Sequence, residues 1–359
     1  MWRVCSRKLE SSHHNCLFLL IILRIKGLML TVLMLPTKNI SVVIPVRPGG
    51  FPTAAIDCLR RINYPLEKLE VLVCEGTQPS RQRNAAVAQS SADIIYFLDD
   101  DSFVSPEVLQ TGLPYLDLPD VAAAGGPAVT HQGATLLEAC AGEVISSVFG
   151  TFLTRARNIP LGEVRQVRGE ELILCNLLMK KNVFLAENGL NPELYPNEEN
   201  ELLKRMRCNG HRFYYVPQML VWRTRRKSLA AISRQYFHYG FGRGRHIFSG
   251  FTFRDFAFFA PPLFVLYLIS LIFFHPLWYT TPLALYLLTA CGSSVIIMRR
   301  SRSAITACCA LALFPLVHAS YGAGFIFGIT SRIRQKQQEK PIRIIKVELT
   351  EEAPAVAYA

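Results

Sequence analysis

The stretch Ile94-Ile95-Tyr96-Phe97-Leu98-Asp99-Asp100-Asp101 decides the fold, because five apolar residues stop abruptly at three acids. A short run that is apolar at every position predicts a strand covered on both faces of a sheet. Two similar runs occur earlier, at residues 40–46 and 70–74, and helical patterns over 53–62 and 80–89 separate the three runs. This alternation predicts an α/β domain with a mostly parallel sheet.

Polar side chains follow all three runs at the point where each strand should end. Arg47 follows the first run, Glu75 the second, and Asp99, Asp100 and Asp101 the third. Ligands of parallel sheets bind beyond the carboxyl ends of the strands, so we expect these groups around one crevice.

The acidic triplet permits two interpretations. Three adjacent carboxylates repel one another and favour a compensating cation or hydrogen-bond donors. Carboxylates at Asp99 and Asp101 could hold a divalent cation that stabilises the negative charge developing on a departing diphosphate. The alternative is a solvated acidic turn that caps the next helix. Spacing alone leaves both interpretations open.

A second polar motif covers residues 197–210. Asn197 can cap a helix whose first turn holds Glu198 and Glu199, and Gly210 can end it. That is an ordinary helix. The functional alternative makes one of the two glutamates a general base that removes a proton from an acceptor hydroxyl.

Three hydrophobic segments follow, at residues 256–274, 277–298 and 304–329, each close to the length that crosses a bilayer. Eight Lys or Arg and no acid lie between residues 221 and 254, and the loop 299–302 is basic. This pattern predicts lipid headgroups rather than nucleic acid as the partner, with the α/β domain in the cytoplasm. The third segment contains Pro315 and several glycines, so we expect it to be kinked or re-entrant and the tail to return to the cytoplasm.

The expected organisation has five parts. Residues 1–38 are an apolar and basic extension, whose charges at Arg24 and Lys26 favour an interfacial helix or a non-essential segment. Residues 39–222 form the α/β domain, 223–255 a basic juxtamembrane region, 256–330 the membrane region with two or three helices, and 331–359 a basic and then disordered tail.

Several motifs, in this order and spacing, resemble the family 2 glycosyltransferases of the GT-A fold, a Rossmann-like fold. Within that family the chain is most similar to the membrane-bound bacterial exopolysaccharide branch, which includes succinoglycan glucosyltransferases. The motifs are Ser41-Val42-Val43-Ile44-Pro45, Arg83-Asn84-Ala85, Phe97-Leu98-Asp99-Asp100-Asp101, Asn197-Glu198-Glu199, Arg234-Gln235-Tyr236-Phe237-His238-Tyr239-Gly240 and His318-Ala319-Ser320-Tyr321-Gly322.

The resemblance implies roles for particular residues. Asp101, assisted by Asp99, would hold Mg²⁺ or Mn²⁺ in a D-x-D motif, and Glu199, preceded by Glu198, would be the catalytic base. The nucleotide-sugar side would comprise Pro45, Arg47, Glu75, Arg83, Asn84, Asp99 and Asp100. The acceptor and diphosphate side would comprise Asn176, Gln235, His238, Tyr239, Arg243 and Arg245.

The resemblance also implies an activity: inverting transfer of a sugar from a nucleotide-diphosphate sugar, with a UDP-sugar expected first, to a lipid-linked acceptor at the bacterial inner membrane. Partners in a polysaccharide assembly complex would then be expected. His238 and Tyr239 replace the Arg and Trp of processive synthases, which favours addition of a single sugar. The alternatives are a polyprenyl-phosphate sugar synthase, whose anionic acceptor needs no base, and an inactive domain that serves as a membrane scaffold.

Overall fold

The computed structural model describes residues 38–246, 251–274, 276–331 and 341–350, together with strands β1 (Ser6–Lys8), β2 (Leu19–Ile25) and β3 (Leu28–Met34). These three strands form an antiparallel sheet of their own. The expected N-terminal interfacial helix is therefore wrong.

The centre of the molecule is an eight-stranded sheet in the order β10-β12-β8-β11-β6-β4-β5-β14. Its strands are β4 (Ile40–Val46), β5 (Leu69–Glu75), β6 (Ile94–Leu98), β8 (Val121–Gly125), β10 (Arg165–Val167), β11 (Asn176–Lys180), β12 (Arg212–Tyr215) and β14 (Arg343–Val347). β4 pairs in parallel with both β5 and β6, as expected, whereas β10, β11 and β14 run in the opposite direction. The α/β prediction is confirmed, with a mixed sheet.

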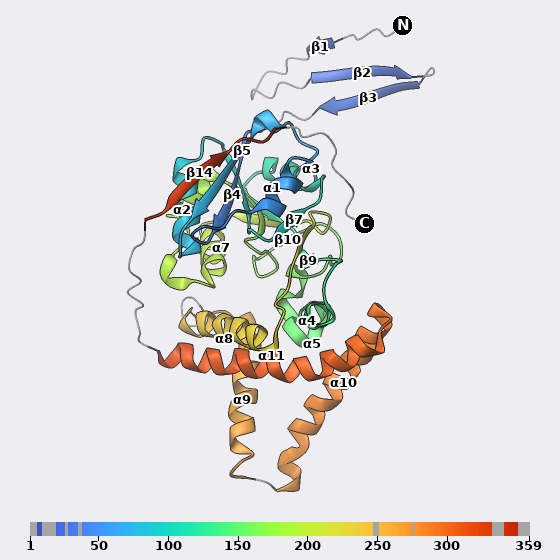
Figure 1. The fold of residues 1–359 in the computed structure, drawn as a ribbon, viewed down its shortest axis with the longest axis vertical. Coiled ribbons are helices and arrows are strands. Elements are labelled where there is room, and N and C mark those ends of the chain that lie inside the picture. Colours follow the sequence, from blue (N-terminus) through green and yellow to red (C-terminus); the bar gives the residue numbers. More distant parts are fainter. Residues whose placement is uncertain are drawn as a thin grey trace.

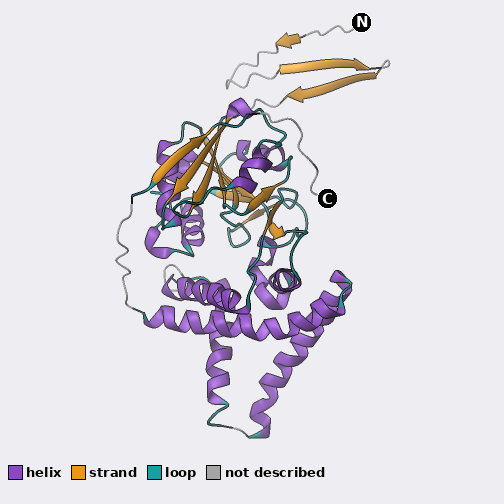
Figure 2. Ribbon diagram, in the orientation of Figure 1, coloured by secondary structure: helices purple, strands orange, loops and turns teal. Residues whose placement is uncertain are grey.

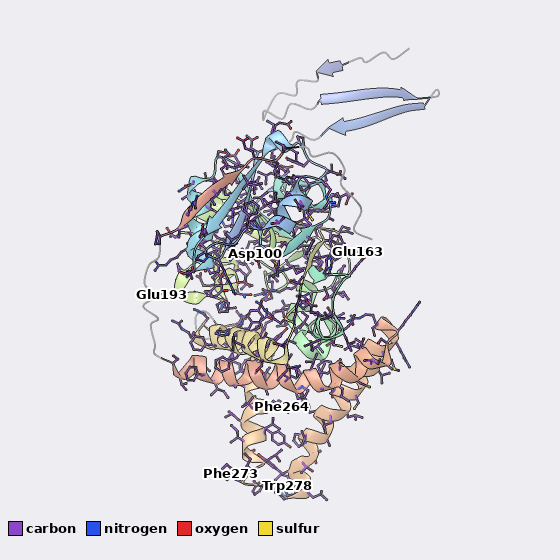
Figure 3. All side chains as sticks on the ribbon, viewed as in Figure 1. Asp100, Glu163, Glu193, Phe264, Phe273 and Trp278 are labelled. Atoms are coloured by element: carbon purple, nitrogen blue, oxygen red, sulfur yellow. The ribbon has the colours of Figure 1, made fainter. Side chains whose placement is uncertain are left out.

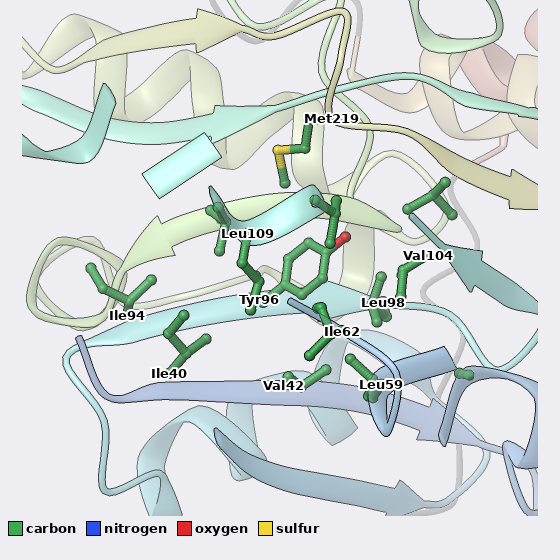
Figure 4. Close-up of a cluster of buried hydrophobic side chains, with 14 of the residues drawn as sticks. Ile40, Val42, Leu59, Ile62, Ile94, Tyr96, Leu98, Val104, Leu109 and Met219 are labelled. Carbon is green, nitrogen blue, oxygen red and sulfur yellow. The ribbon is translucent and has the colours of Figure 1, made fainter. Parts of the chain in front are cut away.

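Helices cover both faces of this sheet (Figures 1 and 2). In the described residues of the domain they are α1 (Thr53–Leu59), α2 (Pro79–Gln89), α3 (Val108–Gly112), α6 (Lys181–Ala186) and α7 (Glu198–Cys208). Two further helices, α4 (Leu136–Ser146) and α5 (Val148–Thr151), lie below the sheet and pack against the C-terminal helices (Figure 1). One apolar cluster joins β4 and β6 to Leu59, Ile62 and Met219 (Figure 4). A second cluster, on Val43, Phe97 and neighbouring residues, packs beneath α2 and α7. Burial on both faces explains why these strands are apolar at nearly every position.

A small second sheet, in the order β7-β13-β9, extends from the acidic triplet. Its strands are β7 (Ser102–Val104), β9 (Ala128–Thr130) and β13 (Val221–Arg223). Antiparallel pairing of β13 with β7 sets Arg223 opposite Ser102, directly beside the acids. The domain therefore extends one residue past the expected boundary at 222, and Arg223 belongs to it rather than to a juxtamembrane region.

Two helices, α8 (Leu229–His246) and α11 (Ala304–Thr330), pack along each other beneath the domain (Figure 1). Glycines make this close approach possible. A β-carbon at Gly240 would meet the carbonyl oxygen of Tyr321 at 2.0 Å, and one at Gly324 would meet that of Phe237 at 2.0 Å. Glycines at a spacing of four on both helices form the small-residue interface that is common between membrane-associated helices.

Among the described residues, three helical segments are long and apolar enough to cross a membrane: Phe253–Ser270, which contains α9 (Ala260–Ser270), Leu277–Ser301, which contains α10 (Thr281–Ser301), and Ala304–Thr330, which is α11. The pair Leu136–Ser146 and Val148–Arg157 also passes by length and composition but is bent by 75°. The α9 and α10 helices form a hairpin with Phe273 and Trp278 at its tip (Figure 3). By contrast, α11 runs crosswise to that hairpin (Figure 1). Pro315 lies inside a continuous α11, so the expected interruption at this proline is wrong; packing against α8 and α4 supports the helix there.

The C-terminal strand β14 returns to the α/β domain. It pairs antiparallel with β5, from Arg343 opposite Glu75 to Val347 opposite Val71. Ile345 and Val347 pack against one apolar cluster of the sheet, and Ile344 packs against the other. This part of the tail was expected to be disordered. The basic residues Arg332, Arg334 and Lys336 lie outside the described residues.

Candidate active site

The acidic triplet follows β6, and two guanidinium groups hold its outer carboxylates. Arg83 Nη2 lies 2.5 Å from Asp99 Oδ1, and Arg223 Nη2 lies 3.0 Å from Asp99 Oδ2. The same Arg223 nitrogen lies 2.8 Å from Asp101 Oδ1. The carboxylates of Asp99 and Asp101 therefore converge on a single point, which a positive charge occupies.

Burial and the neighbouring charges shift the pKa values of Asp99 and Asp100 in opposite directions. Burial raises the pKa of the Asp99 carboxyl, but the charges of Arg223 and Arg83 outweigh it and leave that pKa below its ordinary value. The pKa of Asp100 is raised by loss of hydration and then by the charges of Asp101 and Asp99. Asp100 is exposed, and among the described residues its carboxylate makes no hydrogen bond or ion pair with another residue. The outer two acids are thus paired with arginines, whereas Asp100 faces solvent.

The two glutamates of the second motif begin α7, as expected, with Asn197 as the N-cap residue. Glu199 lies 3.2 Å from Arg157 Nη1, and its side chain is 12% exposed. Glu198 is 3% exposed in its side chain and lies 3.6 Å from Arg83 Nη1. Burial, followed by the charge of Glu199, raises the pKa of Glu198 to about 7. Glu199 is therefore the more accessible of the two carboxylates.

Arg83 connects the two motifs, because one of its nitrogens meets Asp99 and the other approaches Glu198. Its side chain is only 6% exposed. The acids that follow β6 and the glutamates that begin α7 thus belong to one continuous network of charged groups. The sequence places these groups on separate motifs, and the fold brings them together.

The predicted donor side is assembled in part. Glu75 ends β5, and its Oε1 accepts a hydrogen bond from the Gly49 backbone N–H at 2.9 Å, which ties it to the turn that contains Arg47. Pro45 lies within β4 in register with β5. Asn84 uses its side-chain amide to hold the backbone of Leu190, with bonds of 2.7 and 2.9 Å. Its amide is engaged in holding the chain, so we do not retain Asn84 as a donor contact.

Asn176 does not line the site. It is fully buried, and its Oδ1 accepts a hydrogen bond from the Tyr96 hydroxyl at 2.9 Å. Its Nδ2 donates to the carbonyls of Pro127 and Met219 at 3.1 and 2.7 Å. The side chain joins three segments of backbone inside the domain, so the expected acceptor role is withdrawn.

The residues on α8 divide into two sets. Gln235 Nε2 donates to the Tyr239 hydroxyl at 2.9 Å, and Tyr239 lies close enough to Arg223 and Glu199 to interact with their charges, which places this pair near the acids. His238 Nδ1 bonds the Arg234 carbonyl at 2.6 Å.

The two arginines of the other set make different contacts. The Arg243 guanidinium lies 4.1 Å from the ring centroid of Phe258, and Arg245 donates to the carbonyl of Glu193 at 3.1 Å. Their expected contact with a diphosphate stays a prediction.

Two arginines of the site were not predicted. Arg157 holds Glu199 and donates to Asn200 Oδ1 at 2.7 Å, and Arg223 bridges Asp99 and Asp101. Arg223 is one of the eight basic residues that indicate a juxtamembrane region. The one local signal of a different role is its position at the end of a short apolar pattern that predicts a strand.

The residues fit a divalent cation in part. Asp99 and Asp101 supply two hard oxygen ligands that converge on one point. Within the described ranges, no group of three or more His, Cys, Asp or Glu could complete a coordination sphere. Magnesium-like ions are often held by one or two carboxylates together with substrate phosphates, so the remaining ligands would have to come from a bound diphosphate.

Paired aspartates follow a central strand of the mixed sheet, and a glutamate begins a facing helix. This arrangement is typical of transferases that use a nucleotide-bound donor. The family model described as "Glycosyltransferase like family 2" matches residues 36–242, which is more than half of the chain. The chain therefore belongs to the family 2 glycosyltransferases and has the GT-A fold.

One solved structure supports the fold. The mannosyltransferase PcManGT from Pyrobaculum calidifontis, in complex with GDP-Man and Mn²⁺, superposes with a TM-score of 0.51 at 14% identity, over 83% of this chain and 88% of that one. Residues 1–349 of TarS from S. aureus match at a TM-score of 0.36 and 10% identity, over 79% and 90%. No curated protein matches the chain.

Proposed function

We propose that this glycosyltransferase moves one sugar from a nucleotide-diphosphate sugar to a lipid-linked acceptor at the cytoplasmic face of a cell membrane. The observation that carries the proposal is the network from Asp101 through Arg223, Asp99 and Arg83 to Glu198, with Glu199 beside it. It unites a group of carboxylates suited to a diphosphate-bound cation with a carboxylate suited to act as a base.

The proposed reaction is an inverting displacement. The acceptor hydroxyl oxygen forms a bond to the anomeric carbon while the bond from that carbon to the diphosphate oxygen breaks, and the nucleoside diphosphate departs. Glu199 accepts the hydroxyl proton, and Arg157, at 3.2 Å, orients its carboxylate. A divalent cation, Mg²⁺ or Mn²⁺, held by Asp101 and Asp99, would neutralise charge on the departing diphosphate.

The donor base would meet the end of β5. Glu75, fixed by its hydrogen bond to Gly49, borders that end, and the neighbouring turn carries Arg47. A glutamate reaches one methylene further than the aspartate usual at this place in the family, so the identity of the base follows from experiment. PcManGT binds GDP-Man and a TarS structure contains UDP, which makes both nucleotides candidates here.

The acceptor would approach along the membrane. Gln235 and Tyr239 lie on α8, which packs along α11, and α11 runs crosswise to the α9–α10 hairpin (Figure 1). If the hairpin spans the bilayer, α8 and α11 lie at its surface, where a sugar carried on a lipid headgroup would be presented. The β14 strand, paired with β5, then requires the tail to be on the same side as the catalytic domain. The basic loop 299–302 makes that side cytoplasmic.

A panel of nucleotide sugars tests the proposal on the purified full-length protein in detergent. A saturating donor, at about 100 times its dissociation constant, should stabilise the protein by about 2.7 kcal/mol and raise the melting temperature by several degrees. The rise should require Mn²⁺ or Mg²⁺ and disappear in Asp101→Ala. A panel in which no nucleotide sugar is bound or hydrolysed would exclude the transferase function and favour the scaffold alternative.

A further inference from the structure

Arg223 occupies the point at which the two expected metal ligands converge. Its Nη2 lies 3.0 Å from Asp99 and 2.8 Å from Asp101, and its Nε also donates to Asp101 Oδ1 at 2.8 Å. One guanidinium thus contacts both carboxylates, and two of its nitrogens share Asp101 Oδ1; contacts of this kind between charged groups are stronger than those between neutral ones.

The fold holds this arrangement from both sides. Arg223 is the last residue of β13 and lies opposite Ser102, the first residue of β7, so the pairing of two strands fixes its backbone beside the triplet. The Arg223 side chain is 22% exposed, and those of Asp99 and Asp101 are 22% and 33% exposed. The group is partly shielded from water, so its ionic contacts are stronger than those of a surface pair.

A divalent cation cannot share this position with the guanidinium. A cation bound to Asp99 and Asp101 would stand within a few ångströms of a fixed positive charge, and the two would repel each other strongly. Arg83 adds a second positive charge on Asp99. A bound diphosphate reverses this balance, because it brings several negative charges and further oxygen ligands to the same point.

We propose that Arg223 is a resident cation that holds Asp99 and Asp101 together before substrate binds, and that the divalent metal enters only with the nucleotide diphosphate. On entry, the guanidinium leaves the carboxylates and donates to the diphosphate oxygens. This inference rests on the proposed function and adds an order of binding to it. It also adds Arg223 to the cationic groups expected to contact the diphosphate.

Binding of Mn²⁺, followed by electron paramagnetic resonance on the purified full-length protein, tests the inference without measuring turnover. Without nucleotide, Arg223→Gln should bind Mn²⁺ at least about tenfold more tightly than wild type, because the competing charge is removed. Adding UDP or GDP should tighten binding to wild type by a similar factor. Lys227→Gln, which removes the same charge from an exposed side chain four residues on, should match wild type.

The other outcomes are distinct. Wild type that binds Mn²⁺ alone as tightly as Arg223→Gln overturns the resident-cation inference and leaves the metal role in the proposed function intact. Absence of binding in both proteins, with and without either nucleotide, overturns the metal role as well. If Arg223→Gln does not fold, Arg223→Lys replaces it, because a single ammonium cannot reproduce the contacts that two guanidinium nitrogens make with the acids. Its Mn²⁺ affinity without nucleotide should still rise by about threefold, and an unchanged affinity overturns the inference.

Discussion

The buried carboxyl of Glu198 makes stability depend on pH in a predictable direction. Its pKa is about 7, against an ordinary value of 4.5, chiefly because burial disfavours the charged form. Between these two values the folded protein keeps a proton that the unfolded chain has lost, so the stability of the folded state falls as the pH rises through this window. Above about pH 7 the loss is complete.

The size of the effect follows from the same two values. Their difference corresponds to about 3.5 kcal/mol at most, since each pH unit contributes about 1.4 kcal/mol for one proton. Gln mimics the protonated carboxyl in shape and cannot ionise. Glu198→Gln should therefore melt at nearly the wild-type temperature at pH 5 and several degrees above it at pH 8, given about 2–4 °C per kcal/mol for a domain of this size.

Thermal unfolding in detergent at a series of pH values provides the assay. Glu201→Gln is the matched control: it makes the same change on the same helix, but its carboxylate is 26% exposed and pairs with Arg205 on the surface. That variant should shift the melting temperature little at either pH. If Glu198→Gln and wild type show the same dependence on pH, Glu198 is not a buried carboxyl with a raised pKa, and the charged network described above is wrong.

Three further predictions address the membrane-facing part of the chain and its N-terminus. Gly324→Ala should destabilise the protein, because the new β-carbon would meet the Phe237 carbonyl oxygen at 2.0 Å. The control Gly292→Ala on α10 should be neutral or slightly stabilising, because its β-carbon would meet nothing within 4 Å. Equal effects of the two substitutions on the melting temperature would show that α8 and α11 do not pack as described. In a protein otherwise free of cysteine, a single cysteine that replaces Glu348 should resist an impermeant thiol reagent in intact cells. A single cysteine that replaces Leu277, in the α9–α10 connection, should react with the same reagent. Labelling at position 348 would place the tail outside the cell. A variant that begins at Met34 should remain in membranes with wild-type specific activity, since β1, β2 and β3 pair only with one another; loss of activity would assign the N-terminus a role in the site.

Local patterns were sufficient to predict the elements buried on both faces. The strands at 40–46 and 94–98 appear residue for residue, because continuous apolar runs of that length leave little choice of structure. The helix after Asn197 is also confirmed, because its acids and its terminal glycine are local signals. The interruption expected at Pro315 is absent, because α11 is continuous through that residue, and a re-entrant course of this segment stays a prediction.

Contacts between distant segments could not be predicted in this way. Arg223 reaches Asp101 only because β13 pairs with β7, and Arg157 reaches Glu199 from a 3₁₀ turn 42 residues earlier. The β14 strand is a five-residue segment with two basic residues, and it becomes a strand because the edge of β5 is free to pair. Asn84 and Asn176 illustrate the opposite error, since motif position suggested ligand contacts where the fold uses both amides to hold its own backbone.

Transfer of a radiolabelled sugar tests the central claim most directly. Membranes that contain the protein are incubated with the labelled nucleotide sugar that the panel identifies, and the lipids are then extracted into organic solvent. Wild type should place label in the lipid fraction, whereas Glu199→Gln and Asp101→Asn should each reduce the rate by at least about a hundredfold. Full activity of Glu199→Gln would indicate an acceptor that needs no base, as in polyprenyl-phosphate sugar synthesis. Absence of label from the lipid fraction with wild type would contradict the proposed acceptor.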